Sequence, residues 1–298
     1  MKKIPARSGT SQHIPIMVKE VMQFLQISKA GTYIDCTVGY GGHAHHILDQ
    51  LSLNGKLIGI DKDEEAIKFC KKSLSAYSNI QLFRNSYHRI QDILSISKTQ
   101  KVDGMLLDLG LSSPQIDSKS RGFSYKIDSE LDMRFDLDQK FKAHDFLNTK
   151  SKKEIAEIIF KYSDERRSRN IAGNILKMRP MKNVFELVEA IRKSTPPKNR
   201  NKTIARVFQA IRILVNNELS ILENFLSKFC DQLSVGGRIV FISFHSLEDR
   251  IVKHALKKLS FEKKIKILTK KPINPSQEEK YLNSRSRSAK LRAAERIS

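Results

Sequence analysis

The sequence lacks the features that would mark a membrane, secreted or structural zinc protein. No stretch approaches the ~18–20 continuous apolar residues of a membrane span. The basic start of the chain does not lead into an apolar segment, which argues against a secretory signal. Its three cysteines, Cys36, Cys70 and Cys230, are too scattered for a disulfide framework or a zinc site. These absences predict a cytoplasmic protein.

Acidic residues are also scarce relative to basic ones. The 298 residues include 54 Lys and Arg against 32 Asp and Glu, a formal net charge of +22. Because 40% of the residues are apolar, the chain can still build a core, so this charge belongs to a folded protein. Residues 166–202 hold 11 basic and two acidic residues, and residues 253–298 hold 14 and four. Such clusters predict contact surfaces for a nucleic acid, with a generally lysine-rich surface as the alternative.

Short apolar runs alternate with helical patterns in the first half of the chain. We predict strands at residues 33–37, 56–60, 80–83, 102–107 and, much later, 238–243. Strands that alternate with helices form βαβ units and a parallel sheet, the α/β class. Residues 114–202 show only helical periodicity, and one long helix is expected from Val207 to Phe229. We therefore predict a discontinuous α/β domain, residues 1–113 and 203–298, with a helical insertion at 114–202.

A glycine turn follows the first predicted strand. Gly39, Gly41 and Gly42 would let the backbone turn tightly and approach a ligand, although a simple tight turn is the alternative. Asp61 ends the next strand, where an acid can accept hydrogen bonds from both ribose hydroxyls of an adenine nucleoside. Asp35, before the turn, would repel a pyrophosphate but could hold an ammonium group. Together these residues favour S-adenosylmethionine over a nicotinamide dinucleotide.

The turn continues into three histidines, His43, His45 and His46. On a helix, positions 43 and 46 share a face and position 45 does not, so a polar helix surface is the preferred interpretation. We expect no metal ion in this protein.

Asp108 ends the predicted strand at 102–107 and should face the ligand site, because ligands of open α/β sheets bind at the carboxyl ends of strands. A conjugated exocyclic amine is a poor nucleophile, and a carboxylate that accepts its hydrogen bonds can align it with a methyl donor. Asp108, Ser113 and Pro114 at one turn suit that task. The alternative is a structural hydrogen bond at the strand end. Cys36 is expected to pack in the core rather than to act as a nucleophile.

His245 follows the last predicted strand and is a further catalytic candidate. It could accept a proton or stack on a base, or the segment could be a helix cap in which Ser246 and Asp249 take part.

Eight segments in order along nearly the whole chain resemble those of one family. They are residues 35–43, 108–117, 121–125, 131–134, 208–213, 215–219, 242–250 and 285–292. On these segments the sequence resembles the bacterial 16S ribosomal RNA (cytosine-N4)-methyltransferase H family.

The resemblance implies a class I, Rossmann-like methyltransferase sheet with an inserted helical domain, residues 114–202, as the candidate RNA-substrate domain. It also implies direct methyl transfer from S-adenosylmethionine to the N4 amine of the decoding-region cytosine at position 1402, in 16S ribosomal RNA of the small subunit. A homodimer is left open. The family's cofactor contacts fall on Gly41, Gly42, His43, Asp61, Tyr87, Asp108 and Gln115.

The chain departs from the family pattern at Tyr87, where Phe is usual, and at residues 128–130, 163–165 and 202–206. Two other functions stay open at this point: a non-catalytic RNA-binding or assembly factor, and a DNA amino-methyltransferase. The second is disfavoured because no aromatic residue follows Ser113-Pro114 directly to stack on a base. Candidate stacking rings are Phe123, Tyr125, Phe135 and Phe244, and the sequence does not choose among them.

Overall fold

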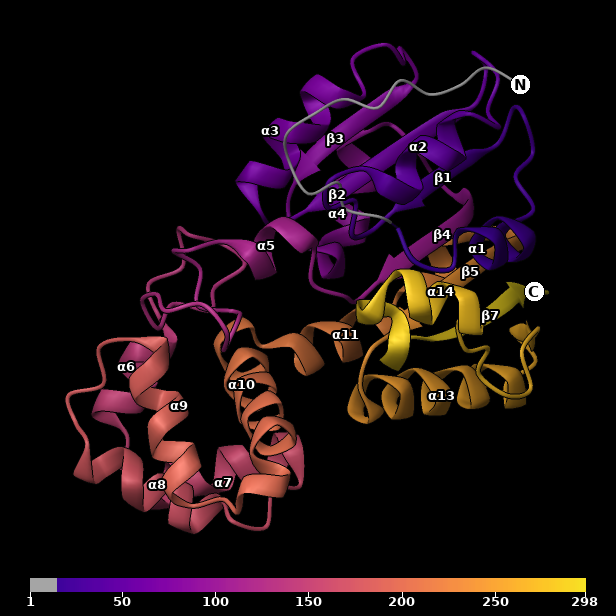
Figure 1. Cartoon of the computed structure of the whole chain (residues 1–298). Helices are drawn as coiled ribbons and strands as arrows, with labels where there is room; N and C mark the ends of the chain where they lie inside the picture. Colours follow the sequence, from indigo (N-terminus) through magenta and orange to yellow (C-terminus); the bar gives the residue numbers. More distant parts are fainter. Residues whose placement is uncertain (1–14) are drawn as a thin grey trace.

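Alternating strands and helices build the first part of the chain, as the sequence predicts. The computed structural model describes residues 15–298 (Figure 1). After α1 (Val18–Leu25), the elements are β1 (Thr32–Asp35), α2 (Gly42–Leu48), β2 (Lys56–Asp61), α3 (Glu64–Ser73), β3 (Ile80–Arg84), η1 (Tyr87–Arg89), α4 (Ile90–Ile96) and β4 (Val102–Asp108). Residues 1–14 of the predicted α/β domain lie outside the described part.

Seven strands form one sheet in the order β3-β2-β1-β4-β5-β7-β6. The five strands β1 to β5 are parallel, with β5 at Leu233–Ser243, whereas β7 (Lys290–Arg296) runs antiparallel between β5 and β6 (Ile265–Ile267). The α/β fold is thereby confirmed. Because the strand order reverses between β1 and β4, a crevice is expected at the carboxyl ends of these two strands.

Both faces of the sheet are covered by apolar side chains. Along β4, Met105 and Leu107 belong to the buried cluster on one face and Leu106 to the cluster on the other. Successive side chains of a strand point to opposite faces, so a continuous apolar run is what a doubly covered parallel strand requires. The sheet is thus a rigid platform for the polar residues at its edge.

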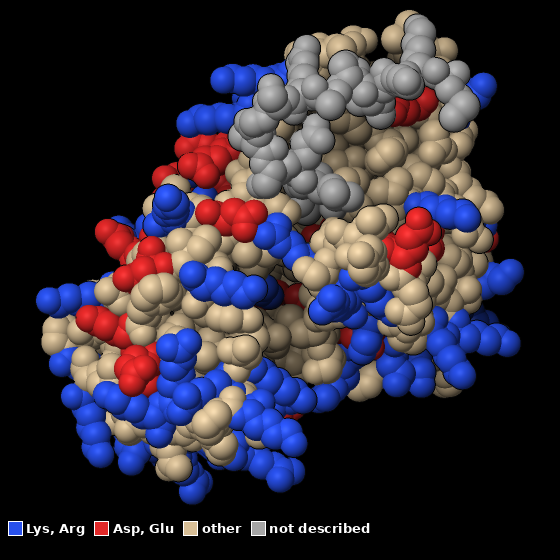
Figure 2. All heavy atoms as spheres, in the orientation of Figure 1, with Lys and Arg blue, Asp and Glu red and all other residues tan. Residues whose placement is uncertain are grey.

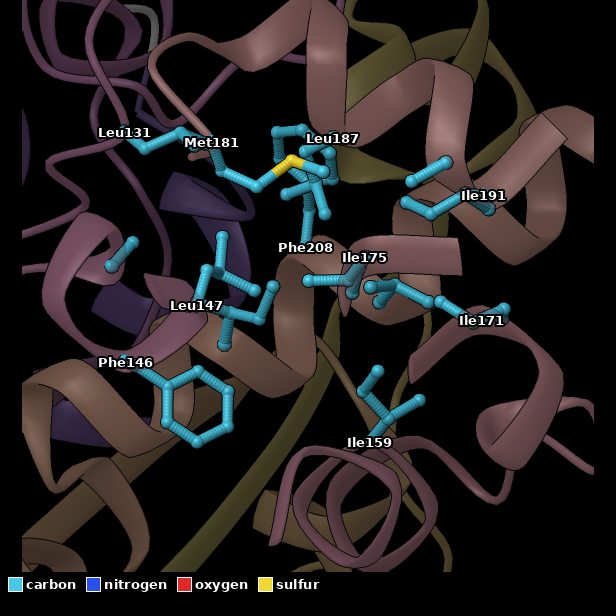
Figure 3. Packing of buried hydrophobic residues seen from close by; sticks show 14 of the residues in the cluster. Leu131, Phe146, Leu147, Ile159, Ile171, Ile175, Met181, Leu187, Ile191 and Phe208 are labelled. Carbon is cyan, nitrogen blue, oxygen red and sulfur yellow. The ribbon is translucent and has the colours of Figure 1, made fainter. Parts of the chain in front are cut away.

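A separate helical unit lies beside the sheet unit, at the lower left of Figure 1. After the short α5 (Ser113–Asp117), its helices are α6 (Ala143–Thr149), α7 (Lys152–Ser163), α8 (Ser168–Lys177), α9 (Val184–Lys193), η2 (Pro197–Asn199) and α10 (Arg200–Asn216). Figure 3 shows side chains from these helices, among them Phe146, Ile159 and Ile175, meeting in a core of their own. Side-chain caps at Ser151 and Asn183 fix where α7 and α9 begin.

The long helix expected from Val207 to Phe229 is interrupted. Asn217 takes a left-handed conformation with φ of 52°, which ends α10 and starts α11 (Glu218–Leu226), followed by α12 (Phe229–Gln232). Val207 and Ile211 of α10 lie in the core of the helical unit, while Phe225 lies in that of the sheet unit. The domain boundary predicted at residue 202 therefore falls inside α10, a helix that shares the core of the helical unit.

The basic C-terminal segment is folded. It forms α13 (Ser246–Phe261), β6, α14 (Gln277–Leu282), η3 (Ser284–Ser288) and β7. Leu291 of β7 is buried between Ile242 of β5 and Ile273, whereas Leu282 and Ile297 are exposed. None of the helices in residues 15–298 has the length and apolar character needed to cross a membrane.

Candidate active site

A pocket opens at the carboxyl ends of β1, β2 and β4. Seven of the predicted site residues line it: Gly39, Gly42, His43, Asp61, Tyr87, Asp108 and Gln115. Asp35, Gly41, Ser113, Pro114 and His245 are not among its lining residues. Most of the predicted cofactor residues therefore meet in one place, and the other candidates surround it.

The glycine turn is held by the acid of the neighbouring strand. The Gly39 N–H donates a hydrogen bond of 2.8 Å to Oδ2 of Asp61, and the Asp63 N–H donates one of 2.9 Å to Oδ1. Gly39 and Gly41 both have positive φ, at 50° and 81°. A Cβ on Gly41 would lie 3.2 Å from Sγ of Cys70, so this glycine packs against α3 and stands behind the pocket wall.

Buried carboxyl groups give this edge of the sheet an unusual electrostatic character. Burial raises the pKa of Asp61 to about 6, although the backbone N–H groups of Asp63 and Gly39 act in the opposite direction. Burial likewise raises the pKa of Asp35 to about 8, and the nearby Asp108 and Asp61 raise it further against the Thr37 N–H. A cationic ligand would relieve both effects, because it favours the ionised carboxylates.

Asp108 lies at the centre of the site. Its backbone N–H donates to Oγ1 of Thr37 at 2.7 Å, and its Oδ1 accepts from the Gly110 N–H at 3.1 Å. Its Oδ2 lies 3.7 Å from Nδ1 of His43, whose Nε2 is 2.9 Å from the Ile16 carbonyl oxygen. His43 is thus buried against Asp108, whereas His45 and His46 are exposed, so the polar helix surface expected for the three histidines holds for two of them.

The turn after Asp108 is a capping box. Oγ of Ser112 accepts from the Gln115 N–H, and Oε1 of Gln115 accepts from the Ser112 N–H. The Gln115 amide also donates to Oδ2 of Asp63 at 2.9 Å, and this oxygen accepts from Arg121 at 3.1 Å. The buried Asp63 therefore ties α5, and the loop after it, to the sheet unit.

Ser113 and Pro114 form the first turn of α5. Ser113 is buried and lines a second, adjoining cavity together with Arg212 and Phe244. Pro114 stands in the first helical turn, where its missing N–H costs nothing.

His245 is the N-cap of α13. Its Nδ1 accepts from the Glu248 N–H at 3.3 Å, so the capping role is confirmed, but His245 and Glu248 perform it instead of Ser246 and Asp249. Asp249 is held by Arg292 at 2.7 Å. The ring of His245 lines a third cavity, which adjoins the main pocket.

Glu218, His245 and Glu248 come close together beside the pocket. Their ligand atoms all lie within 4.8 Å of one another, a spacing that could hold a cation. Glu218 accepts two hydrogen bonds of 2.8 Å from Arg212, and Oε1 of Glu248 lies 3.0 Å from Nε2 of His245. Burial acts to raise the pKa of Glu248, but His245 and Arg212 outweigh it and hold that pKa below its ordinary value. The carboxylate of Glu218 is thus already paired with the guanidinium of Arg212.

Tyr87 lies on the wall beneath α11. Its ring meets that of Phe225 edge-on, with centroids 5.5 Å apart. Burial, and then Glu218 and Glu248, raise the pKa of Tyr87 well above its ordinary value, so its hydroxyl stays protonated. Tyr87 stands where Phe is usual in the family, and its ring still lines the pocket.

Several pocket residues were missed from the sequence. They are Lys62, Asn85, Gly110, Asn216, Glu218 and Glu248, among others. Asn85 follows the end of β3, so the strand-end rule could have found it. Asn216 and Glu218 enter from the junction of α10 and α11, within the segment 215–219 that resembles the family, although no site role was predicted for them there.

Comparison with known proteins gives one consistent result. Residues 10–297 match the sequence model of the MraW methylase family. A protein of Thermosipho africanus named ribosomal RNA small subunit methyltransferase H is 48% identical, over 98% of this chain and 100% of its own length. Proteins of the same name from Fusobacterium nucleatum and Thermotoga neapolitana are 43% and 46% identical, over 97% and 98% of this chain and 98% of their own lengths.

Proposed function

Because this chain belongs to the MraW methylase family, we propose that it transfers a methyl group from S-adenosylmethionine to the N4 amine of a cytosine in 16S ribosomal RNA. The observation that carries this proposal is the full-length match to proteins named ribosomal RNA small subunit methyltransferase H, at 43–48% identity. The alternatives of a DNA methyltransferase and of a non-catalytic assembly factor receive no such support.

The pocket suits the cofactor in charge and in shape. Asp61 accepts two backbone N–H groups, and an ionised carboxylate offers about four acceptor positions, so hydrogen-bonding capacity remains for two ribose hydroxyls. The buried Asp35 and the partly buried Asp108 are carboxyl groups whose ionised forms a cationic sulfonium compound would favour. When bound, the cofactor supplies an electrophilic methyl group. We assign its binding to Asp35, Gly39, Gly41, Gly42, His43, Asp61, Tyr87, Asp108 and Gln115, with Asp35 and Gly41 acting from behind the wall.

Asp108 is the proposed catalytic carboxylate. Held by Thr37 and Gly110, it can accept a hydrogen bond from the exocyclic amine and so orient the nitrogen lone pair. This nitrogen would receive the methyl group of the cofactor, which would leave as a neutral thioether, and the proton that the amine loses would pass to Asp108 or to solvent. Cys36 lines the pocket, but burial raises the pKa of its thiol well above the ordinary value. Direct transfer without a covalent enzyme intermediate follows.

The remaining catalytic assignments are supporting ones. Ser113 and Pro114 set the turn at the start of α5, beside Asp108 in the chain. His245 begins α13 and lines the cavity next to the pocket. We propose that these residues shape the approach of the base to Asp108.

We further propose that the helical unit, including α10, binds the RNA substrate. Figure 2 shows Lys and Arg gathered over the lower end of this unit and along the lower edge of the sheet unit. Two of the departures from the family pattern meet there, since the buried Glu165 accepts a 3.2 Å hydrogen bond from Thr203 and faces Arg206 at 3.9 Å. An RNA inside the small ribosomal subunit, in the cytoplasm, is the substrate we propose, with no metal ion required.

Nucleoside mass spectrometry tests the proposal. Small subunits from a strain without the gene are incubated with the protein and cofactor, and their RNA is digested. We expect N4-methylcytidine with the native chain, a loss of about 10²–10³-fold in rate with Asp108→Ala, and native activity with the exposed control Asp92→Asn. Unchanged N4-methylcytidine after native treatment would refute the function. If Asp108→Ala turns over at the native rate at saturating cofactor, the catalytic role of Asp108 is refuted and the proposed function is not.

A further inference from the structure

Three cavities of the molecule meet at Phe244. The main pocket and the two adjoining cavities share Leu111 and Phe244 as lining residues. Phe244 directly follows β5, next to the end of β4, because Asp108 and Ile242 are partners in the sheet. This ring therefore forms part of the wall between the pocket and its neighbours.

One of these neighbours has the composition of a base-binding site. We name it the aromatic cavity; it is lined by Phe123, Tyr125, Phe208, Gln209, His245 and Phe244, among others. Rings supply the flat faces on which bases stack, and the amide and imidazole groups supply polar contacts for a base edge. It contacts both units, because Phe208 and Gln209 come from α10 and Phe244 from the end of β5.

The ring contacts distinguish Phe244 from the other candidates. Phe123 is stacked on Phe135, with centroids 5.4 Å apart, and Tyr125 meets Phe208 edge-on at 5.9 Å. Within residues 15–298, no such ring partner is found for Phe244, which is partly exposed. A partly exposed ring without an aromatic partner is the one that can receive a base without first breaking an existing stack.

Gly110 brings this ring close to Asp108. A Cβ added to Gly110 would lie 2.7 Å from Cε2 of Phe244 and 3.1 Å from Oδ1 of Asp108, so both groups border the same glycine. The Phe244 N–H donates to Oε2 of Glu248 at 2.8 Å, which fixes the backbone that carries the ring. A base on this ring would thus be within reach of the carboxylate.

We propose that Phe244 is the surface on which the target cytosine stacks after it leaves the RNA, with the aromatic cavity receiving the base. The inference rests on the proposed function and adds the residue that selects the position of the base. Gly110 is the matching positioning residue, since any side chain there would displace the ring.

Two RNAs and two leucine variants test this role. The RNAs are identical except that one lacks the base at the target position, and the variants are Phe244→Leu and Phe261→Leu, whose parent Phe261 is 90% exposed at the end of α13. We expect Phe244→Leu to lower kcat/KM for the complete RNA roughly 5- to 150-fold at saturating cofactor, the range for one base stack. Its affinity for the baseless RNA should equal that of the native protein. Phe261→Leu should change neither quantity, and Phe244→Tyr should restore most of the lost activity.

The outcomes separate the two proposals. The stacking role is refuted, while the function stands, if the native chain methylates RNA and Phe244→Leu has the native kcat/KM. The same holds if Phe244→Leu lowers the affinity for the complete and the baseless RNA equally. If the native chain does not methylate RNA, the function itself fails.

A spectroscopic readout is independent of turnover. Because the sequence contains no tryptophan, Phe244→Trp would introduce a single indole. Its fluorescence should be quenched by the complete RNA and much less by the baseless RNA, whereas a Phe261→Trp control should not distinguish the two. Equal quenching of Phe244→Trp by both RNAs would contradict the proposal.

Discussion

The carboxyl edge of the sheet and the surface of the helical unit carry opposite charges. At the sheet edge Asp35 and Asp63 are each 1% exposed, and Asp61 and Asp108 border the pocket. In residues 166–202 of the helical unit, 11 basic residues outnumber two acidic ones. The net charge of +22 therefore does not describe the whole surface, because the chain includes two regions that attract different ligands. A small cation suits the first and a polyanion suits the second, so one protein can hold both at once.

The sharpest test of this contrast is its dependence on salt. RNA affinity should fall about 10³-fold between 50 and 200 mM salt, because each neutralised phosphate releases counterions, while cofactor affinity should change little. Filter binding and calorimetry measure the two. Lys198→Gln with Lys202→Gln on the helical unit should reduce the slope of log affinity against log salt, by roughly 0.9 for each phosphate that is no longer neutralised. Lys71→Gln with Lys72→Gln on α3 is the matched control. Equal effects of the two pairs would show that position does not matter.

The second test removes one carboxylate from the acidic region. Asp61→Asn should weaken cofactor binding about ten- to a hundredfold, since the variant can no longer offer a charged acceptor to the ribose hydroxyls, and should leave RNA binding unchanged. Isothermal calorimetry measures the first and filter binding the second. The control is Asp103→Asn, which should bind cofactor with native affinity. Asp103 lies at the amino end of β4, away from the pocket, and accepts a hydrogen bond from the Thr32 N–H. A loss of RNA affinity in Asp61→Asn alone would mean that the two regions are not independent.

The third and smallest effect is a pH dependence of cofactor affinity. The pKa of Asp61 is raised to about 6, mainly by burial, so the free protein binds a proton there at pH 5 and has lost it at pH 7. Ribose hydroxyls donate to the ionised form, so binding releases that proton and affinity rises with pH. We expect Asp61 to contribute an increase of about tenfold from pH 5 to 7, and Asp35, whose pKa is raised to about 8, to contribute a further rise above pH 7. Asp61→Asn should abolish the rise between pH 5 and 7; a rise in that interval that persists in the variant would assign it to another group.

Much of the sheet unit was predictable because its signals are local. Apolar runs ended by Asp61 and Asp108 predict both the strands and the edge where ligands bind, and the structure places these two acids in one pocket. The helical unit was recognised by its periodicity. Its extent was not, because periodicity identifies the buried face of α10 but not the core against which that face packs.

The features that escaped prediction depend on residues distant in the sequence. The sequence indicates only that Gly110 is a turn residue; the structure adds that the ring of Phe244 packs against it. Glu218 reads as an ordinary helix residue until Arg212 and the loop before α13 surround it. The strand β7 was missed since its paired alanines, Ala293 and Ala294, carry little strand preference and are buried through their neighbours alone.

The position of β7 has a consequence for the order in which the protein can mature during synthesis. β5 carries Phe244 just beyond its end, and its outer neighbour is a strand made only at residues 290–296. β6 pairs only with that same strand within the described sheet. A nascent chain that stops short of β7 therefore leaves one edge of β5 unpaired. The strand that leads into Phe244 gains its second neighbour only after residues 290–296 have been synthesised, more than forty residues after β5 itself.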